Sequence, residues 1–280
     1  MRLQLAKFLV GHRIVDIKIL SAKTISGDTK KLIGGKVIGT RRFGKVSVID
    51  LSNGYSILIH VKLTGQFIYR GPNLPKPYPL SPKVTGGVPG KHTHVIFNLD
   101  HDGVLYYNDV RRFGWIKIEK SDKVQETSFI SKLGPEPPVA KGFGGQALTL
   151  DLFKQILSKT SRPIKIVLMD QSKMGGVGNI YANDALWLAK IDPKTPAKNL
   201  SDADDITLYN DILLVLKAGL KYGGASELAF VTPDGKEGEY QNHTLAYGHD
   251  GELCPRCKKS KFEKYFLGGR GTYWCPNCQV

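Results

Sequence analysis

The sequence predicts an α+β protein in which a β-rich N-terminal half is followed by a helical region and a cysteine-rich tail. Three observations lead to this prediction. β-Branched and polar residues alternate from Gly34 to about Ile118, apolar residues recur at helical spacing after Leu152, and all four cysteines lie at or beyond Cys254. A chain of 280 residues is long enough for two domains and a small appendage.

The first ten residues predict a helix. Leu5, Phe8 and Leu9 share one helical face, and Gly11 is placed to end the helix. No capping residue and no acidic first turn precede these apolar positions, although a complete helix start usually has one or both. We therefore expect the chain to start partway along a helix.

The segment after Gly34 predicts a β domain built from hairpins. Asn53-Gly54 and Asp102-Gly103 each separate two alternating apolar runs, which is typical of a tight hairpin turn. Between the hairpins, residues 70–91 are rich in proline and glycine and predict a long surface loop. Residues 131–146 have a similar composition and predict a linker to the next domain.

Helical periodicity dominates the segment after this linker, so the second domain is predicted to be helical. A first apolar stripe consists of Leu152, Phe153, Ile156 and Leu157. Ser201 can cap a later helix that ends at Gly223-Gly224. The residues of that helix expected to face inward are Ile206, Tyr209, Leu213, Leu216 and Leu220.

A glycine-rich stretch lies within residues 164–187, after the apolar run from Ile164 to Met169. One interpretation is a strand followed by a phosphate-binding loop, but neither usual glycine motif of a nucleotide-binding loop is present. We favour two helices joined by a tight turn, with the backbone amides of Gly178 and Asn179 opening the second helix. Such a helix start can bind a phosphate group, including one in a DNA backbone.

The chain is strongly basic, with 40 lysine and arginine residues against 25 aspartate and glutamate residues and a net charge of +15. This charge favours a polyanionic partner, with nucleic acid ahead of an anionic membrane surface, and the alternative is simply a basic soluble protein. The apolar runs are too short to span a bilayer, and the basic start lacks the apolar core of a signal peptide. We therefore expect a cytoplasmic protein with no membrane partner.

The four cysteines form two C-x2-C pairs, Cys254 with Cys257 and Cys275 with Cys278. Thiolates at this spacing can point at one tetrahedral ion, so we expect all four to hold one structural zinc ion (Zn2+) rather than to form a redox pair or stay unligated. Lysines and aromatic residues lie between the pairs, and Arg270 lies in a glycine-rich turn. This pattern predicts a basic hairpin that contacts nucleic acid; the alternative is a solvated charged loop.

Longer motifs occur in order along nearly the whole chain: FLVGHRI, RRFGKVSVIDL, IHVKLTGQ, KHTHVIF, YNDVRRFGW, LGPEP, IKIVLMDQ, GVGNIYAND, GGASE and YGHDGELC. Through these motifs and the paired cysteines, the chain resembles the formamidopyrimidine-DNA glycosylase and endonuclease VIII family. A zinc-ribbon transcription or translation factor would explain the charge and the cysteines, but not LGPEP or GVGNIYAND.

The resemblance implies a fold and a division into domains. It implies an N-terminal glycosylase β-sandwich domain over residues 1–119 and a linker over 120–145. A helical domain with a DNA-binding helix-two-turn-helix is expected over 146–245, followed by a four-cysteine zinc-finger hairpin over 246–280.

The resemblance also implies an activity and a partner. Members of the family flip a damaged base out of double-stranded DNA, remove it, and cleave the abasic site by β,δ-elimination. GGASE and DGKEGEYQNH are closer to the branch that acts on oxidised purines such as 8-oxoguanine and formamidopyrimidines, with a lesion-capping loop near residues 226–241. We expect a monomer, and the alternatives are an oxidised-pyrimidine glycosylase of the endonuclease VIII type and a non-catalytic damaged-DNA-binding protein.

Residue by residue, the resemblance assigns roles to eight positions besides the cysteines. Lys45 matches a proton donor and phosphate contact in β-elimination, and Arg270 matches a hairpin arginine active in δ-elimination. His92 and Arg111 match DNA contacts, and Lys165 and Asn179 match phosphate contacts. Leu63, Arg111 and Phe113 match the residues that fill the space left by the flipped nucleotide, although Leu63 and Phe113 taken alone would be assigned to the core.

Several positions depart from the family pattern. Leu63 replaces the usual methionine, Val110 replaces a proline, and His249 replaces an arginine. FLVGHRI matches the end of the family's first helix, so we expect a missing segment before Met1 that carries the family's catalytic N-terminal proline and glutamate. On this expectation the chain as written binds DNA without glycosylase activity.

Overall fold

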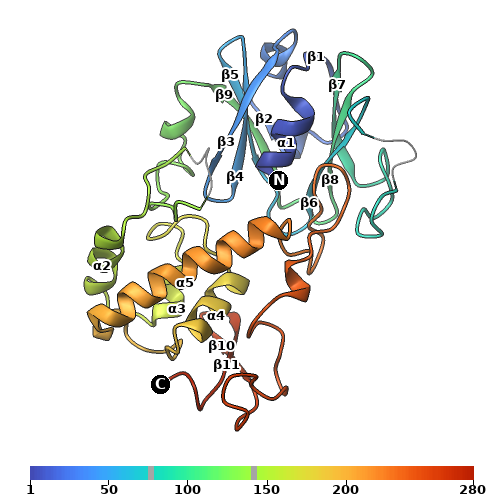
Figure 1. Cartoon of the computed structure of the whole chain (residues 1–280). Helices are drawn as coiled ribbons and strands as arrows, with labels where there is room; N and C mark the ends of the chain where they lie inside the picture. Colours follow the sequence, from blue (N-terminus) through green and yellow to red (C-terminus); the bar gives the residue numbers. More distant parts are fainter. Residues whose placement is uncertain (75–78, 140–143) are drawn as a thin grey trace. The chain divides into compact units, whose positions relative to one another are not determined.

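The computed structural model of the chain describes residues 1–74, 79–139 and 144–280 (Figure 1). Contacts divide the chain into two compact units, residues 1–131 with 222–241 and residues 132–221 with 242–280. The domain boundaries expected at residues 119, 145 and 245 stay a prediction. Parts of the expected surface loop and linker, residues 75–78 and 140–143, lie outside the described residues.

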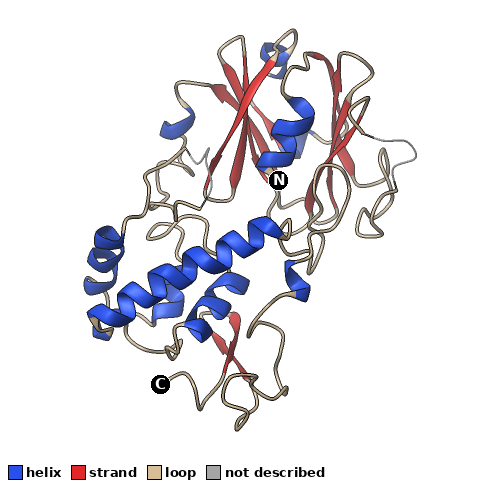
Figure 2. Cartoon of the chain, in the orientation of Figure 1, coloured by secondary structure: helices blue, strands red, loops and turns tan. Residues whose placement is uncertain are grey.

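The first unit is a β-sandwich of two sheets (Figure 2). One sheet has the order β1-β7-β8-β6, with β1 (Ile14–Ile19), β6 (Gly65–Arg70), β7 (Thr93–Leu99) and β8 (Val104–Asp109). The other has the order β2-β9-β5-β4-β3, with β2 (Ile25–Ser26), β3 (Val37–Phe43), β4 (Val46–Leu51), β5 (Tyr55–His60) and β9 (Trp115–Lys120). Only β2 and β9 pair in parallel among these strands.

Both predicted hairpins are confirmed. Gly54 has φ +81° between β4 and β5, and Asp102 has φ +58° between β7 and β8, as tight turns of this kind require. The β structure begins earlier than predicted, at Ile14 rather than after Gly34. Strand β1 lies at a sheet edge and leaves Val15 and Ile19 exposed, so its sequence lacks the clean alternation of a half-buried strand.

The predicted N-terminal helix is confirmed as α1 (Arg2–Leu9), which buries Leu5, Phe8 and Leu9. Gly11 follows it with φ +100°, a conformation that favours glycine. The Phe8 ring stacks on the Tyr69 ring of β6 with centroids 5.4 Å apart, and α1 also contacts β3. The helix therefore belongs to the core of the sandwich, which includes buried residues from both sheets.

The expected surface loop is partly buried. The described residues between β6 and β7 form neither helix nor strand, as predicted, but Val84 packs with Ile68 and Val231 in a small apolar cluster. Val231 comes from the segment 222–241, which belongs to the same unit. The physical reason is that this later segment covers the loop, which no local pattern around residue 84 indicates.

The second unit is helical and ends in a short hairpin (Figure 1). Its helices are α2 (Leu150–Ser158), α3 (Ile164–Met169), α4 (Asn179–Leu188) and α5 (Asp202–Lys221), and its strands are β10 (Glu263–Leu267) and β11 (Arg270–Trp274).

Short 3-10 turns occur in both units, at η1 (Ala22–Thr24), η2 (Thr29–Leu32), η3 (Val124–Glu126), η4 (Ala197–Asn199) and η5 (Tyr240–Asn242). The two-helix interpretation of residues 164–187 is confirmed. Within the described ranges, no helix has the length and apolar character needed to cross a membrane.

Helix α5 begins as predicted but buries the predicted face only in part. The Ser201 hydroxyl accepts a hydrogen bond from the backbone N–H of Asp204 at 3.2 Å, and the Asp204 carboxylate accepts one from the backbone N–H of Ser201 at 3.1 Å. Of the residues expected to face inward, Tyr209 and Leu216 pack against the helical core and Leu213 is half-buried. The prediction is wrong for Ile206 and Leu220, which are 42% and 44% exposed.

The buried stripe of α5 is set by a close helix crossing. It runs through Leu208, Ile212, Val215 and Gly219. A Cβ atom at Gly219 would collide with the Tyr181 ring of α4, so only glycine allows this approach. The face is therefore fixed by a neighbour that the periodicity of α5 does not reveal.

Candidate nucleic-acid interface and zinc site

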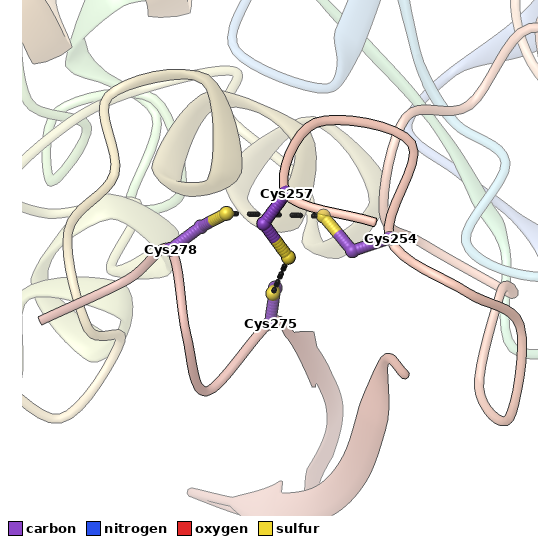
Figure 3. Close-up of side chains that lie close together, drawn as sticks. All are labelled: Cys254, Cys257, Cys275 and Cys278. Atoms are coloured by element: carbon purple, nitrogen blue, oxygen red, sulfur yellow. Dashed lines mark hydrogen bonds between the residues drawn. The ribbon is translucent and has the colours of Figure 1, made fainter. Parts of the chain in front are cut away.

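The four cysteines lie together as predicted (Figure 3). All four Sγ atoms lie within 4.8 Å of one another, and those of Cys254 and Cys278 are 3.9 Å apart while those of Cys257 and Cys275 are 3.7 Å apart. A tetrahedral zinc ion with four Zn–S bonds places its sulfur atoms about 3.8 Å apart. The donor set therefore fits one zinc ion.

The protonation of the cysteines also suits a metal site. Backbone N–H groups of Ser260 and Lys259 lower the pKa of Cys257 to about 6, which makes it a thiolate at neutral pH. Burial raises the pKa of Cys275 to about 12, so at neutral pH this thiol keeps its proton until a bound cation displaces it into the solvent.

The cysteine segment is attached to the end of α4. Arg256, between the first two cysteines, donates to the carbonyl oxygens of Trp187 at 2.7 Å and Leu188 at 3.2 Å. Its guanidinium carbon lies 4.1 Å from the centre of the Trp187 ring. One apolar cluster contains Trp187, Phe262 and the buried Cys254 and Cys275. The zinc segment thus shares its small core with the helical domain.

The hairpin of β10 and β11 carries Arg270 directly after its glycine turn, with the side chain exposed. The backbone after Arg270 is tied to two helices. The Nζ atom of Lys165 in α3 donates to the carbonyl oxygen of Gly271 at 2.7 Å and to the Thr272 hydroxyl at 2.8 Å. The Nδ2 atom of Asn179 in α4 donates to the same carbonyl oxygen at 3.1 Å.

Lys165 is fully buried, which the sequence did not predict. Burial lowers the pKa of its ammonium group to about 7. Asn183, one turn along α4, accepts a hydrogen bond from the backbone N–H of Tyr273 at 2.8 Å. The structure therefore brings Lys165 and Asn179 together beside Arg270, and their phosphate contacts stay a prediction.

The start of α4 has the predicted form of an anion site. Its N-cap residue Gly178 has no side chain to bond the first amides of the helix. The preceding turn is braced by Gln171, whose side chain donates to the Val177 carbonyl at 2.8 Å and accepts from the Gly176 N–H at 3.0 Å. A braced turn presents these amides in a fixed direction.

In the first unit, Leu63, Arg111 and Phe113 gather at one end of the β1-β7-β8-β6 sheet, and we call them the wedge cluster. Leu63 precedes β6 and the other two follow β8, and Gly65 of β6 is paired with Asp109 of β8. Leu63 is 46% exposed and Phe113 is 57% exposed, so neither is a core residue. The guanidinium carbon of Arg111 lies 4.8 Å from the centre of the Phe113 ring.

Lys45 and His92 lie in turns of the same unit. Lys45 is exposed between β3 and β4, after Gly44 with φ +54°. Burial, followed by the charges of Lys62 and Lys45, lowers the pKa of His60 to about 4. Neutral His60 accepts a hydrogen bond from the backbone N–H of Lys62 at 3.0 Å, next to Leu63. His92 is half-buried directly before β7.

The segment expected to cap the lesion is internally bonded. Ser226 is fully buried, and its hydroxyl donates to the Phe230 carbonyl at 2.5 Å and accepts from the Gly238 N–H at 2.8 Å. Its own backbone N–H donates to the Gln241 side chain at 2.7 Å. Leu228, in the same segment, is 63% exposed. The capping role stays a prediction.

The sequence analysis did not identify four residues that bond to the predicted site residues or to the segments that carry them. They are His60, Asp109, Asn183 and Arg256. Each lies within a few residues of one that was singled out, inside the motifs IHVKLTGQ, YNDVRRFGW and GVGNIYAND or between the first two cysteines. Their position within a motif was the signal that could have identified them, because none of the four belongs to a residue spacing that indicates a function.

Three family models match the chain in order. They are the formamidopyrimidine-DNA glycosylase N-terminal domain over residues 1–116, the formamidopyrimidine-DNA glycosylase H2TH domain over 133–230, and a zinc finger found in FPG and IleRS over 251–280. With the geometry of the four cysteines, the last match identifies one structural zinc site.

Curated and solved proteins are similar over nearly the full length. The formamidopyrimidine-DNA glycosylase of Lactiplantibacillus plantarum is 34% identical, with 97% of this chain and 93% of that protein covered. The one from Listeria monocytogenes is 37% identical, with 89% and 83% covered. The solved complex of Lactococcus lactis Fpg with abasic-site DNA is 30% identical with a TM-score of 0.83, covering 99% of this chain and 96% of that one.

The comparisons do not support one expectation about the N-terminus. The N-terminal domain model matches from residue 1, so the prediction of a missing segment before Met1 is not supported. The lack of glycosylase activity inferred from that prediction loses its support with it.

Proposed function

The chain belongs to the formamidopyrimidine-DNA glycosylase family, and we propose that it is a base-excision repair enzyme that removes oxidised purines from double-stranded DNA. The wedge cluster is the observation that carries this proposal. Leu63 and Phe113 expose large apolar surfaces in the free protein, and the Arg111 guanidinium lies over the Phe113 ring. A wedge and a ring of this kind suit the space that a flipped nucleotide leaves in the duplex.

The proposed chemistry is amine catalysis at the damaged nucleotide. An unprotonated amine of the protein attacks C1′, the bond from C1′ to the base breaks, and the base leaves with a proton. The sugar ring opens to give a Schiff base. Loss of a C2′ proton then expels the 3′ phosphate, and loss of the C4′ proton expels the 5′ phosphate.

Two residues are proposed to act on these eliminations. Lys45 is exposed in its turn and would donate a proton and contact phosphate during β-elimination. Arg270 is exposed at the hairpin turn and would stabilise the phosphate expelled in δ-elimination. The bonds from Lys165 and Asn179 to Gly271 support this second role, because they fix the backbone that presents Arg270.

The remaining predicted residues are proposed to hold the DNA. His92 and Arg111 would contact DNA from the first unit, and Lys165, Asn179 and the start of α4 would contribute phosphate contacts from the second. The net charge of +15 agrees with a polyanionic partner. When bound, the zinc ion supplies folding free energy rather than chemistry, and Cys254, Cys257, Cys275 and Cys278 would hold it.

The proposed substrates are oxidised purines in duplex DNA, and the protein is proposed to act as a monomer in the cytoplasm, on the nucleoid. A solved Lactococcus lactis relative, 30% identical to this chain, is described in complex with FAPY-dG containing DNA, which supports this substrate class. Oxidised pyrimidines are the competing class.

Borohydride trapping tests the proposal. The purified protein is mixed with duplexes that contain 8-oxoguanine, thymine glycol or no lesion, and sodium borohydride reduces any Schiff base to a stable adduct. We expect an adduct with the 8-oxoguanine duplex, and peptide mapping of that adduct identifies the attacking amine. An adduct only with thymine glycol would assign the protein to the pyrimidine class. Binding without any adduct would support the non-catalytic alternative.

A further inference from the structure

Asp109 lies where three segments of the predicted DNA-contacting surface meet. It is the last residue of β8, the strand between β7 and β6 in the sheet. Because β8 is antiparallel to both neighbours, its end meets the start of each of them. Leu63 comes just before β6, His92 comes just before β7, and Arg111 and Phe113 follow β8.

Asp109 is buried, with 1% of its surface exposed, and its carboxylate accepts four hydrogen bonds. One oxygen accepts from the Thr64 hydroxyl and from the backbone N–H of Arg111 at 3.2 Å. The other accepts from the Tyr107 hydroxyl at 3.2 Å and from the backbone N–H of Gly114 at 2.8 Å. The carboxylate thus bonds to Arg111 itself and to the residues that follow Leu63 and Phe113.

The backbone of Asp109 makes two further bonds to the third segment. Its N–H donates to the carbonyl oxygen of His92 at 3.0 Å. Its carbonyl oxygen lies 2.7 Å from Nε2 of His94, which is buried. A single residue therefore connects the segments that carry Leu63, His92, Arg111 and Phe113.

The turn after β8 needs such an anchor. Arg112 has φ +56°, a conformation that L-residues rarely adopt, and a Cβ atom at Gly114 would collide with the Tyr107 hydroxyl and approach the His60 carbonyl. Residues 110–113 contain two exposed apolar side chains and two arginines, and they bury little that could fix the turn. The charge-assisted bonds to Asp109 supply that fixation.

We propose that Asp109 is a positioning residue that holds the wedge cluster in the arrangement that fills the duplex after a nucleotide flips. This inference rests on the proposed function, since it names what prepares that site for lesion DNA. Asp109 touches no substrate. It fixes the backbone of the cluster before DNA binds, so less conformational entropy is lost on binding.

The test is a double-mutant cycle on lesion-specific binding. The probe is a duplex with a tetrahydrofuran abasic analogue, and the readout is its affinity relative to an undamaged duplex of the same sequence. In Asp109→Asn, the amide nitrogen faces a backbone N–H in either orientation, so one anchor is lost. We expect the preference for the tetrahydrofuran duplex to fall about 10- to 100-fold.

The same change is then made in the Leu63→Ala/Arg111→Ala/Phe113→Ala background, which lacks all three side chains of the wedge cluster. If Asp109 acts through the wedge cluster, Asp109→Asn there costs less than about threefold, because the side chains it positions are gone. An equal loss in both backgrounds, or no loss in either, overturns the proposal. Thr64→Val, which removes one partner of the carboxylate at a partly exposed site, decides the question if Asp109→Asn does not fold.

Asp100→Asn is the matched control. Asp100 lies in the turn at the other end of the β7–β8 hairpin, where its carboxylate accepts from the Arg13 N–H at 3.0 Å and bonds to His12 at 2.9 Å. We expect a lower melting temperature and an unchanged lesion preference. Incision of an 8-oxoguanine duplex by the wild type is scored separately. If the wild type does not incise this duplex but the double-mutant cycle shows the expected coupling, the proposed function is contradicted and the positioning role of Asp109 is supported.

Discussion

The Nζ atom of Lys165 lies 2.7 Å from the carbonyl oxygen of Gly271, the residue after Arg270. A buried amine of the helical domain therefore holds the tip of the zinc-bearing hairpin. Burial lowers its pKa to about 7, whereas the unfolded chain would hold this proton up to about pH 10.5. The unfolded state thus binds more protons than the folded state between pH 7 and pH 10.5.

This difference predicts that the free energy of unfolding contributed by Lys165 rises with pH across that window. Between pH 7 and pH 9.5 the rise is on the order of 3 kcal/mol. Urea unfolding of the wild type and of Lys165→Met measures it, and the variant should lack this part of the rise. Lys217→Met, an exposed position on α5, is the control. Equal pH dependence in all three proteins would show that the amine titrates normally.

The lowered pKa of His60 predicts a second pH dependence of stability, at acidic pH. Its folded pKa of about 4 lies below the usual value of 6.5, so the unfolded state binds more protons between these values. Stability is therefore lost as pH falls from 6.5 to 4, by about 2 kcal/mol after allowance for solvent screening. His60→Phe should flatten this part of the unfolding curve, while His101→Gln, at an exposed turn, should not.

The wedge cluster predicts a loss of activity without a loss of stability. Leu63→Ala and Phe113→Ala remove exposed side chains, so melting temperatures should stay within about 2 °C of the wild type. Excision of 8-oxoguanine should fall about tenfold or more, because an unfilled stack raises the cost of base flipping. Ile38→Ala is the control, since Ile38 is an exposed apolar residue of β3. A similar loss in that variant would point to a general surface effect.

The cysteine site predicts one zinc ion per chain. Cys275→Ser should lose stoichiometric zinc and bind DNA more weakly, because the hairpin that carries Arg270 loses its support. Arg256→Ala should keep the zinc, since Arg256 contacts the end of α4 and provides no ligand. Metal analysis of both variants measures this, and full zinc content in Cys275→Ser would contradict the ligand set.

The proposed role of Arg270 predicts that replacing it changes the cleavage product and does not prevent base excision. Arg270→Ala should still release the base and cut on the 3′ side, with the second cut slowed about tenfold or more. Denaturing gels that separate β- from β,δ-elimination products provide the measurement. Lys261→Ala, another exposed basic residue before β10, should leave the product ratio unchanged. Loss of base release in Arg270→Ala would assign the arginine to an earlier step.

Local patterns in the sequence predicted the elements that depend on neighbours along the chain. The helix of Leu5, Phe8 and Leu9, the two hairpin turns and the cap at Ser201 each follow from spacing or turn chemistry. The cysteine site followed from spacing as well, because its ligands are paired within short turns. The family resemblance added the positions whose chemistry no spacing reveals.

Features that depend on packing between distant segments were not predictable. The buried face of α5 is set by the Tyr181 ring against Gly219, and the burial of Lys165 is set by the hairpin more than a hundred residues later. Asp109 gains its role from the register that places β8 between β6 and β7. In each case the partner is fixed by the fold rather than by the adjacent sequence.

The central claim is that this chain excises oxidised purines and cuts the DNA at the resulting site. Its most direct test is incubation of the purified protein with a labelled duplex that contains one 8-oxoguanine, followed by a denaturing gel without any chemical cleavage step. The result expected is a strand cut at the lesion with phosphate at both new ends. An intact strand, despite tight binding of the same duplex, would contradict the claim.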